Sequence, residues 1–389
     1  MSTARSRRAL SLVPEYGARV AKLPERSLVD ITAGMLASIQ ELREYPAVSV
    51  ILAVAGPTFS AGDRARGEEL VDEAAHRLAY EFGPSVVAAI VDPLPRALAE
   101  MVGARVDGGV VLLRATGELH AFRLRITPTE RVVVDPTFAT RDLVRSLAES
   151  EPYGIVVLAK DRARLMVVTP DGARVVAEID ERDPQRQRAD RRGHLHQPQR
   201  SGRDQRLVEA FMARVSHRVN AEPALRSLDL VIVAPDHLGT RFQRSHHPSH
   251  GARIAGRIPG NRLIDSPESV AGIARTVIRS HRTEREHEVL GQLARADREG
   301  RADRGVEATW HALHHASGQH LIVEHDFAFA AYLESGGTDV LPAAVRETPS
   351  ATDDLVDEMI ELAMLKLGTV SFVEPGSLDG DGVAVIRRH

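Results

Sequence analysis

The residues best suited to contact a polyanion lie in one polar stretch, 181–206, which is rich in arginine and almost free of apolar side chains. Arginine forks donate paired hydrogen bonds to phosphate groups, and a glutamine amide can hold a water molecule or a ribose hydroxyl. We therefore predict a long exposed loop that binds RNA, with a solvated loop without a ligand as the alternative. The RNA-binding candidates are Arg186, Arg188, Arg191, Arg192, His194, His196, Arg200, Arg203 and Arg206, and the weak catalytic candidates are Gln197 and Gln205.

Histidines gather in a second place, at residues 311–325. His311 and His315 are spaced to share one face of a helix, a geometry that zinc can use. The glutamate of a His-Glu-x-x-His site is missing, so we interpret them as structural or surface residues. The stretch 379–382 resembles the start of a calcium loop, but the later ligand positions fall on apolar and basic residues, which predicts a tight turn. The sequence contains no phosphate-binding, dinucleotide-binding or nucleophile-elbow motif, and we expect neither a metal nor a cofactor.

The charge is distributed unevenly along the chain. The net charge of −4 argues against a protein that coats nucleic acid indiscriminately. Residues 182–304 contain 24 arginines against 15 acids, whereas residues 323–381 contain 13 acids against Arg346 and Lys366. Codon usage in a GC-rich genome accounts for 47 arginines beside three lysines, but not for the concentration of positive charge in one segment. One part of the molecule can thus face phosphate while another faces water or a basic protein.

Length and composition restrict the class of protein. A chain of 389 residues exceeds one ordinary hydrophobic core, so two or three domains are expected. The longest apolar runs, such as Val86–Val91, have the length of a strand rather than of a membrane span. The first residues lack the hydrophobic core of a signal peptide, and the absence of cysteine excludes disulfides and thiolate chemistry. We therefore expect a soluble cytoplasmic protein.

The periodicity of apolar residues predicts a mixed α/β protein with three domains. After a flexible lead-in at 1–26, the N-terminal α/β domain covers 27–150 and begins with an amphipathic helix, Ser27–Glu44. The central domain, 151–282, is a small β-rich α/β domain with strands Gly154–Lys160, Leu165–Thr169 and Ala173–Ile179, followed by the basic loop 181–206. A charged helix, 283–299, leads into the C-terminal domain, 283–389, for which we expect an α/β/α sandwich.

The order of these elements and several sequence segments resemble those of the bacterial branch of the archaeo-eukaryotic peptide-chain release factor family, which includes Pelota-like proteins. The similar strings are Tyr153–Lys160, its partner Ala163–Val168, the acidic helix from Asp353 that leads into Gly368–Val373, and the ending Gly382–Arg388. The resemblance covers residues 150–389 well and the first domain by topology only. It implies a C-terminal domain like RNA-binding ribosomal proteins and a central domain whose loop bears Gly-Gly-Gln in true release factors. This chain has no Gly-Gly-Gln.

The resemblance implies a ribosome-binding protein that occupies the A site of stalled or hibernating ribosomes, in ribosome rescue or a stress response. The missing Gly-Gly-Gln predicts that it does not hydrolyse peptidyl-tRNA. Two alternatives stay open: a peptidyl-tRNA hydrolase that uses Gln197 or Gln205 in a degenerate Gly/Gln loop, and a non-ribosomal protein whose acidic C-terminal face docks a basic partner. The expected partners are the RNA of the ribosomal A site and a translation factor. We expect no membrane, no small-molecule substrate and a monomeric protein.

Overall fold

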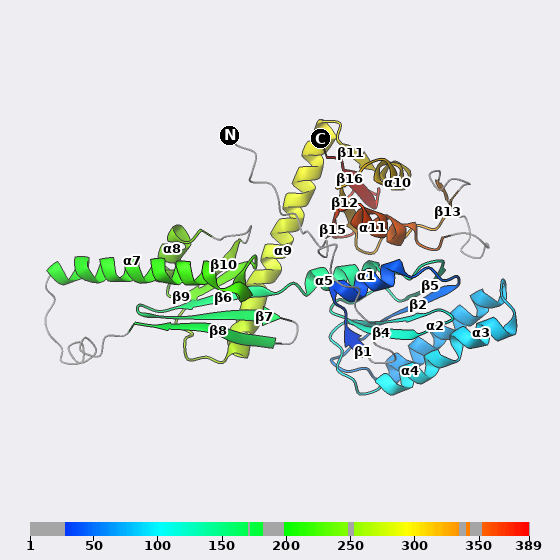
Figure 1. The fold of residues 1–389 in the computed structure, drawn as a ribbon, viewed down its shortest axis with the longest axis horizontal. Helices are drawn as coiled ribbons and strands as arrows, with labels where there is room; N and C mark the ends of the chain where they lie inside the picture. The colour runs from blue at the N-terminus through cyan, green and yellow to red at the C-terminus, as the bar shows by residue number, and fades with distance from the viewer. Residues whose placement is uncertain are drawn as a thin grey trace. The chain divides into compact units, whose positions relative to one another are not determined.

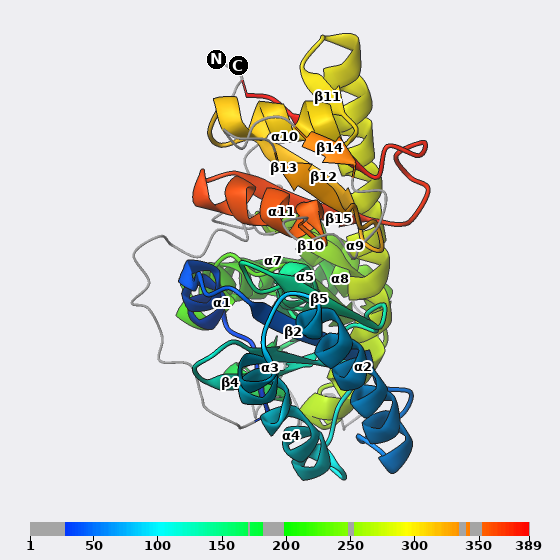
Figure 2. The same cartoon turned by 90° about the vertical axis from the view of Figure 1, so that its right-hand side faces the viewer.

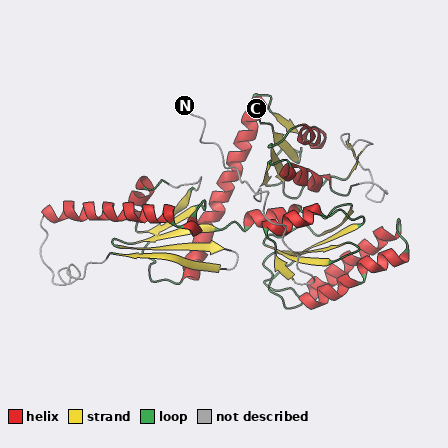
Figure 3. Cartoon of the chain, viewed as in Figure 1, coloured by secondary structure: helices red, strands yellow, loops and turns green. Residues whose placement is uncertain are grey.

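The computed structural model describes residues 28–169, 172–181, 198–247, 253–333, 340–342 and 352–388. The fold is mixed α/β, as predicted, and Figures 1 and 3 show helices packed against several separate sheets. By its internal contacts the chain forms two compact units. Unit 1 contains residues 150–287, and unit 2 contains residues 28–149 together with 288–388. The division into three domains stays a prediction. None of the helices in the described ranges combines the length and the apolar character that a bilayer-spanning helix needs.

The first part of unit 2 is a five-stranded sheet with helices on both faces. Its elements are β1 (Leu28–Asp30), α1 (Ala33–Glu41), β2 (Ala47–Ala53), α2 (Ala61–Ala79), α3 (Pro84–Val91), α4 (Pro93–Met101), β3 (Gly109–Arg114), β4 (Leu119–Leu124), β5 (Arg131–Asp135) and α5 (Arg141–Glu149). The strand order is β1-β4-β3-β2-β5. The helices α2, α3 and α4 cover one face of this sheet, and α1 and α5 cover the other (Figure 2).

The predicted helix Ser27–Glu44 is wrong at its beginning. Residues 28–30 form β1, which pairs in parallel with β4. The helix α1 begins only after Thr32, whose Oγ1 accepts a hydrogen bond from the backbone nitrogen of Met35 at 3.3 Å. A threonine with extended backbone at this position satisfies an amide that would otherwise lack a partner. The cap therefore belongs to Thr32 and not to Ser27.

The second part of unit 2 is a four-stranded sheet with the order β11-β16-β12-β15. This part contains β11 (Ala302–Arg304), α10 (Val306–His315), β12 (His320–Glu324), β13 (Ala331–Leu333), β14 (Val340–Pro342), α11 (Leu355–Leu365), β15 (Thr369–Val373) and β16 (Val383–Ile386), of which β13 and β14 pair in a separate two-stranded sheet. The helices α10 and α11 pack on one face, and Val289 and Leu293 of α9 (Pro267–Arg298) pack on the other.

A buried ionic cluster joins α5 to α11 within unit 2. Arg141 is only 2% exposed, and its Nη1 lies 3.1 Å from Oδ2 of Asp354. One turn further along α11, Asp357 accepts hydrogen bonds from the backbone nitrogens of Thr140 (2.9 Å) and Arg141 (2.6 Å), and so caps α5 from another element. Burial, together with the charge of Asp354, raises the pKa of Asp357 to about 7. The contact between α5 and α11 is therefore made by polar and charged groups that are buried from solvent.

Unit 1 is built on a five-stranded sheet with the order β10-β9-β6-β7-β8. Its strands are β6 (Tyr153–Leu158), β7 (Arg162–Thr169), β8 (Gly172–Asp180), β9 (Leu230–Ala234) and β10 (Ile254–Pro259). The helices α7 (Pro198–Ala221) and α8 (Asp236–Ser245) pack on one face, and α9 packs on the opposite face. The three strands predicted for the central domain are thus present as β6, β7 and β8, and β8 lies at the edge of the sheet.

Candidate nucleic-acid interface

The predicted basic loop is only partly within the described residues. Arg186, Arg188, Arg191, Arg192, His194, His196 and Gln197 lie outside them. The remaining candidates correct the prediction, because Arg200, Arg203, Gln205 and Arg206 lie in the helix α7 and not in a loop. Pro198 occupies the first helical position, where its missing N–H is not needed. Arginine and glutamine are good helix formers, so the helix extends from its anchored part toward its N-terminus.

The anchored part of α7 begins with Val208. Phe211, Met212, Val215 and Val219 are buried against the sheet of unit 1 and lie on one face of the helix. Arg206 is exposed. The apolar stripe therefore anchors α7 on the sheet. The polar first turns continue the same helix without being anchored by it.

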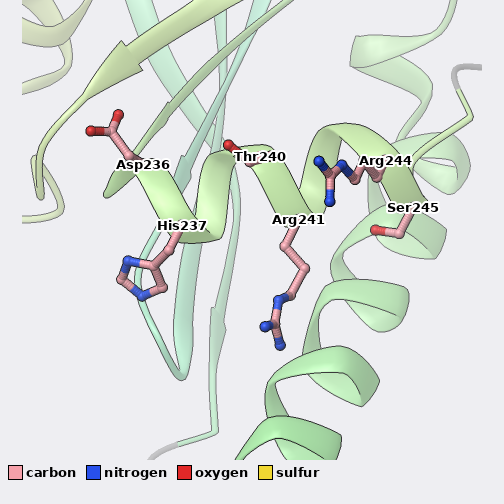
Figure 4. Close-up of a pocket in the computed structure, with 6 residues that line it drawn as sticks. All are labelled: Asp236, His237, Thr240, Arg241, Arg244 and Ser245. Atoms are coloured by element: carbon pink, nitrogen blue, oxygen red, sulfur yellow. The ribbon is translucent and has the colours of Figure 1, made fainter.

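A groove on α8 contains a second set of cationic side chains. The helix follows β9 directly, and its residues Leu238 and Phe242 are buried against the sheet. His237, Arg241 and Arg244 are spaced i, i+4 and i+7, which places them on a shared face. The groove has a volume of about 560 Å³, and Figure 4 shows the side chains that line it: Asp236, His237, Thr240, Arg241, Arg244 and Ser245.

The charges in this groove leave a positive excess. Nη1 of Arg241 lies 3.7 Å from Oε1 of Glu209 on α7, a long contact for an ion pair. Arg257 of β10 donates a hydrogen bond to Oγ1 of Thr240. Arg244 is exposed, and within the described ranges its guanidinium has no carboxylate partner. An exposed guanidinium that is not already paired can bind a phosphate group at little cost in lost contacts.

A buried histidine fixes α8 against α7. The ring of His246 stacks on Phe242 with 4.9 Å between the centroids, and its Nδ1 lies 2.8 Å from Oγ of Ser216. Burial, with a smaller effect of His247, lowers the pKa of His246 to about 4, so the ring is neutral at pH 7. Nδ2 of Asn220 also donates to the carbonyl oxygen of His247 at 3.2 Å. These contacts give the basic side chains of the groove a firm support.

The groups in and around the groove on α8 are of a kind that binds anions. In the described part of the chain, no three His, Asp or Glu side chains gather in a way that would hold a metal ion. The pair His311 and His315 is exposed, with its rings stacked at a centroid distance of 4.0 Å. The groove on α8 offers guanidinium groups and an imidazole, which bind anions but provide no activated nucleophile.

Comparison with known proteins finds a family that is similar to the segment containing this groove. Residues 152–316 match the model of bacterial archaeo-eukaryotic release factor family 3. Over these residues the chain is similar to that family. The match supports the resemblance predicted from the sequence, and the matched residues include α7 and α8. No curated protein matches the chain.

Several solved structures are similar to this chain at low sequence identity. An archaeal translation termination factor is 14% identical, with 94% of this chain and 100% of that chain covered and a TM-score of 0.26. Dom34 of S. cerevisiae, a translation termination-like factor, is 13% identical over 69% of this chain and 72% of its own, with a TM-score of 0.39. Archaeal Pelota, in a model of its ribosome-bound form with ABCE1, is 11% identical, with 95% and 98% covered and a TM-score of 0.41.

Sequence reasoning missed the groove on α8. It did not consider the basic residues of the helix that follows β9. The available signal was the spacing of His237, Arg241 and Arg244, which share one face of the helix beside the buried face of Leu238 and Phe242. A basic stripe beside an apolar stripe on a short helix predicts a supported cationic surface.

Proposed function

We propose that this protein is a ribosome-binding, release-factor-like factor of the cytoplasm that occupies the A site of stalled or hibernating ribosomes and does not hydrolyse peptidyl-tRNA. The observation that supports it best is the family match over residues 152–316, the segment that also carries the supported groove on α8. Arg241 and Arg244 would contact phosphates of ribosomal RNA, and the arginines of α7 would extend the contact. The proposed partners are thus the ribosome and a translation factor.

The absence of Gly-Gly-Gln supports the non-hydrolytic form of the proposal. The chain has no Gly-Gly-Gln, and Gln205, one of its two candidate glutamines, lies in the helix α7, whereas Gln197 lies outside the described residues. A helical backbone uses its amides for its own hydrogen bonds, so it cannot bend around a substrate as a glycine turn does.

Ribosome binding is tested by co-sedimentation through a sucrose cushion over a range of salt concentrations. The double variant Arg241→Ala/Arg244→Ala should bind more weakly, because each phosphate contact releases condensed counterions. The slope of log affinity against log salt should fall by about 1 for each lost contact. The matched control is Arg275→Ala/Arg279→Ala, which removes the same charge from exposed positions of α9 on the opposite face of the sheet.

Two results would overturn the proposal. A wild-type protein that does not pellet with ribosomes even at low salt would favour a non-ribosomal interaction protein. Release of peptide from peptidyl-tRNA complexes, lost in Gln197→Ala or Gln205→Ala, would favour the hydrolase. Equal weakening by both double variants would refute the specific role of the groove on α8 while leaving ribosome binding intact.

A further inference from the structure

A second groove lies in unit 2, along α10 and beside β11 and β16. It has a volume of about 740 Å³. Ala308, Ala312 and Ala316, four residues apart, contribute small apolar side chains to its lining. Small residues along one helix face leave room for a side chain that comes from outside. The alanines alone do not indicate which ligand binds in the groove. The polar groups around them do.

One side of this α10 groove carries Glu307, His311 and His315, again four residues apart. The rings of the two histidines are stacked, with 4.0 Å between the centroids and 23° between the planes. Nδ1 of His315 lies 2.8 Å from the carbonyl oxygen of His311, which fixes that ring on the helix. Glu307 is exposed, and its carboxylate has no cationic partner among the residues that the structure describes.

The other side of the α10 groove is formed by Asp303, Arg387 and Gln319. Nε of Arg387 lies 3.0 Å from Oδ2 of Asp303, so these two charges compensate each other. Gln319 is 2% exposed, and its Nε2 donates to the carbonyl oxygen of Ala312 at 2.9 Å. That hydrogen bond fixes the amide and leaves Oε1 buried without a hydrogen-bond donor within the described part of the chain. A buried acceptor without a donor is unfavourable, and a ligand that brings N–H groups would satisfy it.

These features together fit one kind of ligand group. The groove offers an uncompensated carboxylate, an acceptor without a donor and a pair of flat rings. A guanidinium group is planar, carries five N–H donors, stacks on flat rings and forms forked hydrogen bonds with carboxylates. An ammonium group is compact and does not stack, and a phosphate would be repelled by Glu307. RNA is therefore a poor occupant of this groove, and an arginine side chain is a good one.

We propose that the α10 groove is a docking site for an arginine of a basic peptide segment in a partner protein. Glu307 receives the guanidinium, His311 and His315 support its face, and Oε1 of Gln319 accepts a further N–H. The site is separate from the groove on α8 and does not depend on ribosome binding. A partner held here would contact unit 2, while unit 1 keeps its own basic surface.

The test is isothermal titration of the full-length protein with the peptide acetyl-Gly-Arg-Gly-Arg-Gly-amide. Two matched peptides carry citrulline or lysine in place of both arginines. The arginine peptide should bind, the citrulline peptide should bind at least about tenfold more weakly because charge is lost, and the lysine peptide should lie between them. Failure of the arginine peptide to bind at millimolar concentration, or equal binding of the citrulline peptide, would overturn the proposal.

Variants of the protein locate the binding. Glu307→Gln keeps the shape of the side chain and should weaken the arginine peptide about tenfold or more. The control Glu69→Gln removes the same charge from an exposed position on α2 and should change nothing. His311→Ala/His315→Ala should remove the preference for arginine over lysine. Gln319→Met deletes the acceptor Oε1 and should weaken peptide binding; because it also deletes the donor to the carbonyl oxygen of Ala312, the melting temperature is measured beside the affinity. Equal affinities for Glu307→Gln and Glu69→Gln would refute the assignment.

Discussion

The buried Arg141 allows a sharp test of the ionic contact between α5 and α11. Its substitution by alanine removes the guanidinium that lies 3.1 Å from Asp354, while Asp354 and Asp357 stay buried nearby. Removing one partner of a buried pair costs about 3–5 kcal/mol, because the other charge is left without compensation. Arg141 also donates to the carbonyl oxygen of Phe327, and the loss of that hydrogen bond acts in the same direction.

Trp310 provides the assay. It is the single tryptophan of the chain, it lies in α10 of unit 2 and it is 5% exposed, so its fluorescence follows the unfolding of that unit. For a urea m-value of about 2 kcal/mol/M, a loss of about 4 kcal/mol moves the midpoint down by about 2 M. Unit 1 contains no tryptophan and does not contribute to this signal.

A second variant separates charge from packing. In Arg141→Met/Asp354→Asn both charges are gone, and the asparagine Oδ1 can still accept from the backbone nitrogens of Val356 and Phe329, as Asp354 does at 3.2 and 3.3 Å. We expect the double variant to be more stable than Arg141→Ala by about 2 kcal/mol. A loss of less than about 1 kcal/mol in Arg141→Ala, within the range of exposed ion pairs, would refute the reasoning.

Two further predictions concern unit 2. The pKa of Asp357 is raised to about 7 in the folded state, so the folded protein binds a proton that the unfolded chain releases, and stability should fall as pH rises from about 4 to 7. Asp357→Asn should remove a part of this slope, up to about 1.4 kcal/mol per pH unit, as urea midpoints at pH 5 and 8 would show; an unchanged slope would contradict the assignment. Gly382 has φ of +68°, and an added Cβ would lie 2.3 Å from the ring of Phe327. Gly382→Ala should therefore lower the melting temperature of unit 2, whereas Gly376→Ala, also at positive φ but with open space around it, should lower it less.

The strands of unit 1 were predictable because their causes are local. Runs of β-branched residues such as Ile155–Val157 favour extended backbone, and Gly172, with φ of +134°, permits the turn between β7 and β8. The composition of residues 198–206 is also a local signal, but it predicts the wrong secondary structure. It predicts a loop, whereas the apolar stripe that begins further on extends the helix α7 through these residues.

The ionic contact between α5 and α11 could not be predicted in the same way. Thr140 and Asp357 are 217 residues apart in sequence, and each alone has the appearance of an ordinary helix-terminal residue. The acidic beginning of α11 predicts a helix start, and it does so correctly through Asp354. That the next acid along the helix caps a different helix depends on packing, which periodicity does not encode. The same holds for Gln319, whose orphan oxygen is visible only in three dimensions.

The strand β8 has a consequence for how the protein behaves at high concentration. It lies at the edge of its sheet, and in the described ranges no further strand pairs with its outer side. Such an edge is a template for adding strands from other copies, which leads to aggregation. Arg174, Glu178 and Asp180 are exposed along it, and the pairing with β7 shifts between Leu165 and Met166. Charges of both signs and an irregular register make a second copy fit poorly, and both features protect this edge against self-association.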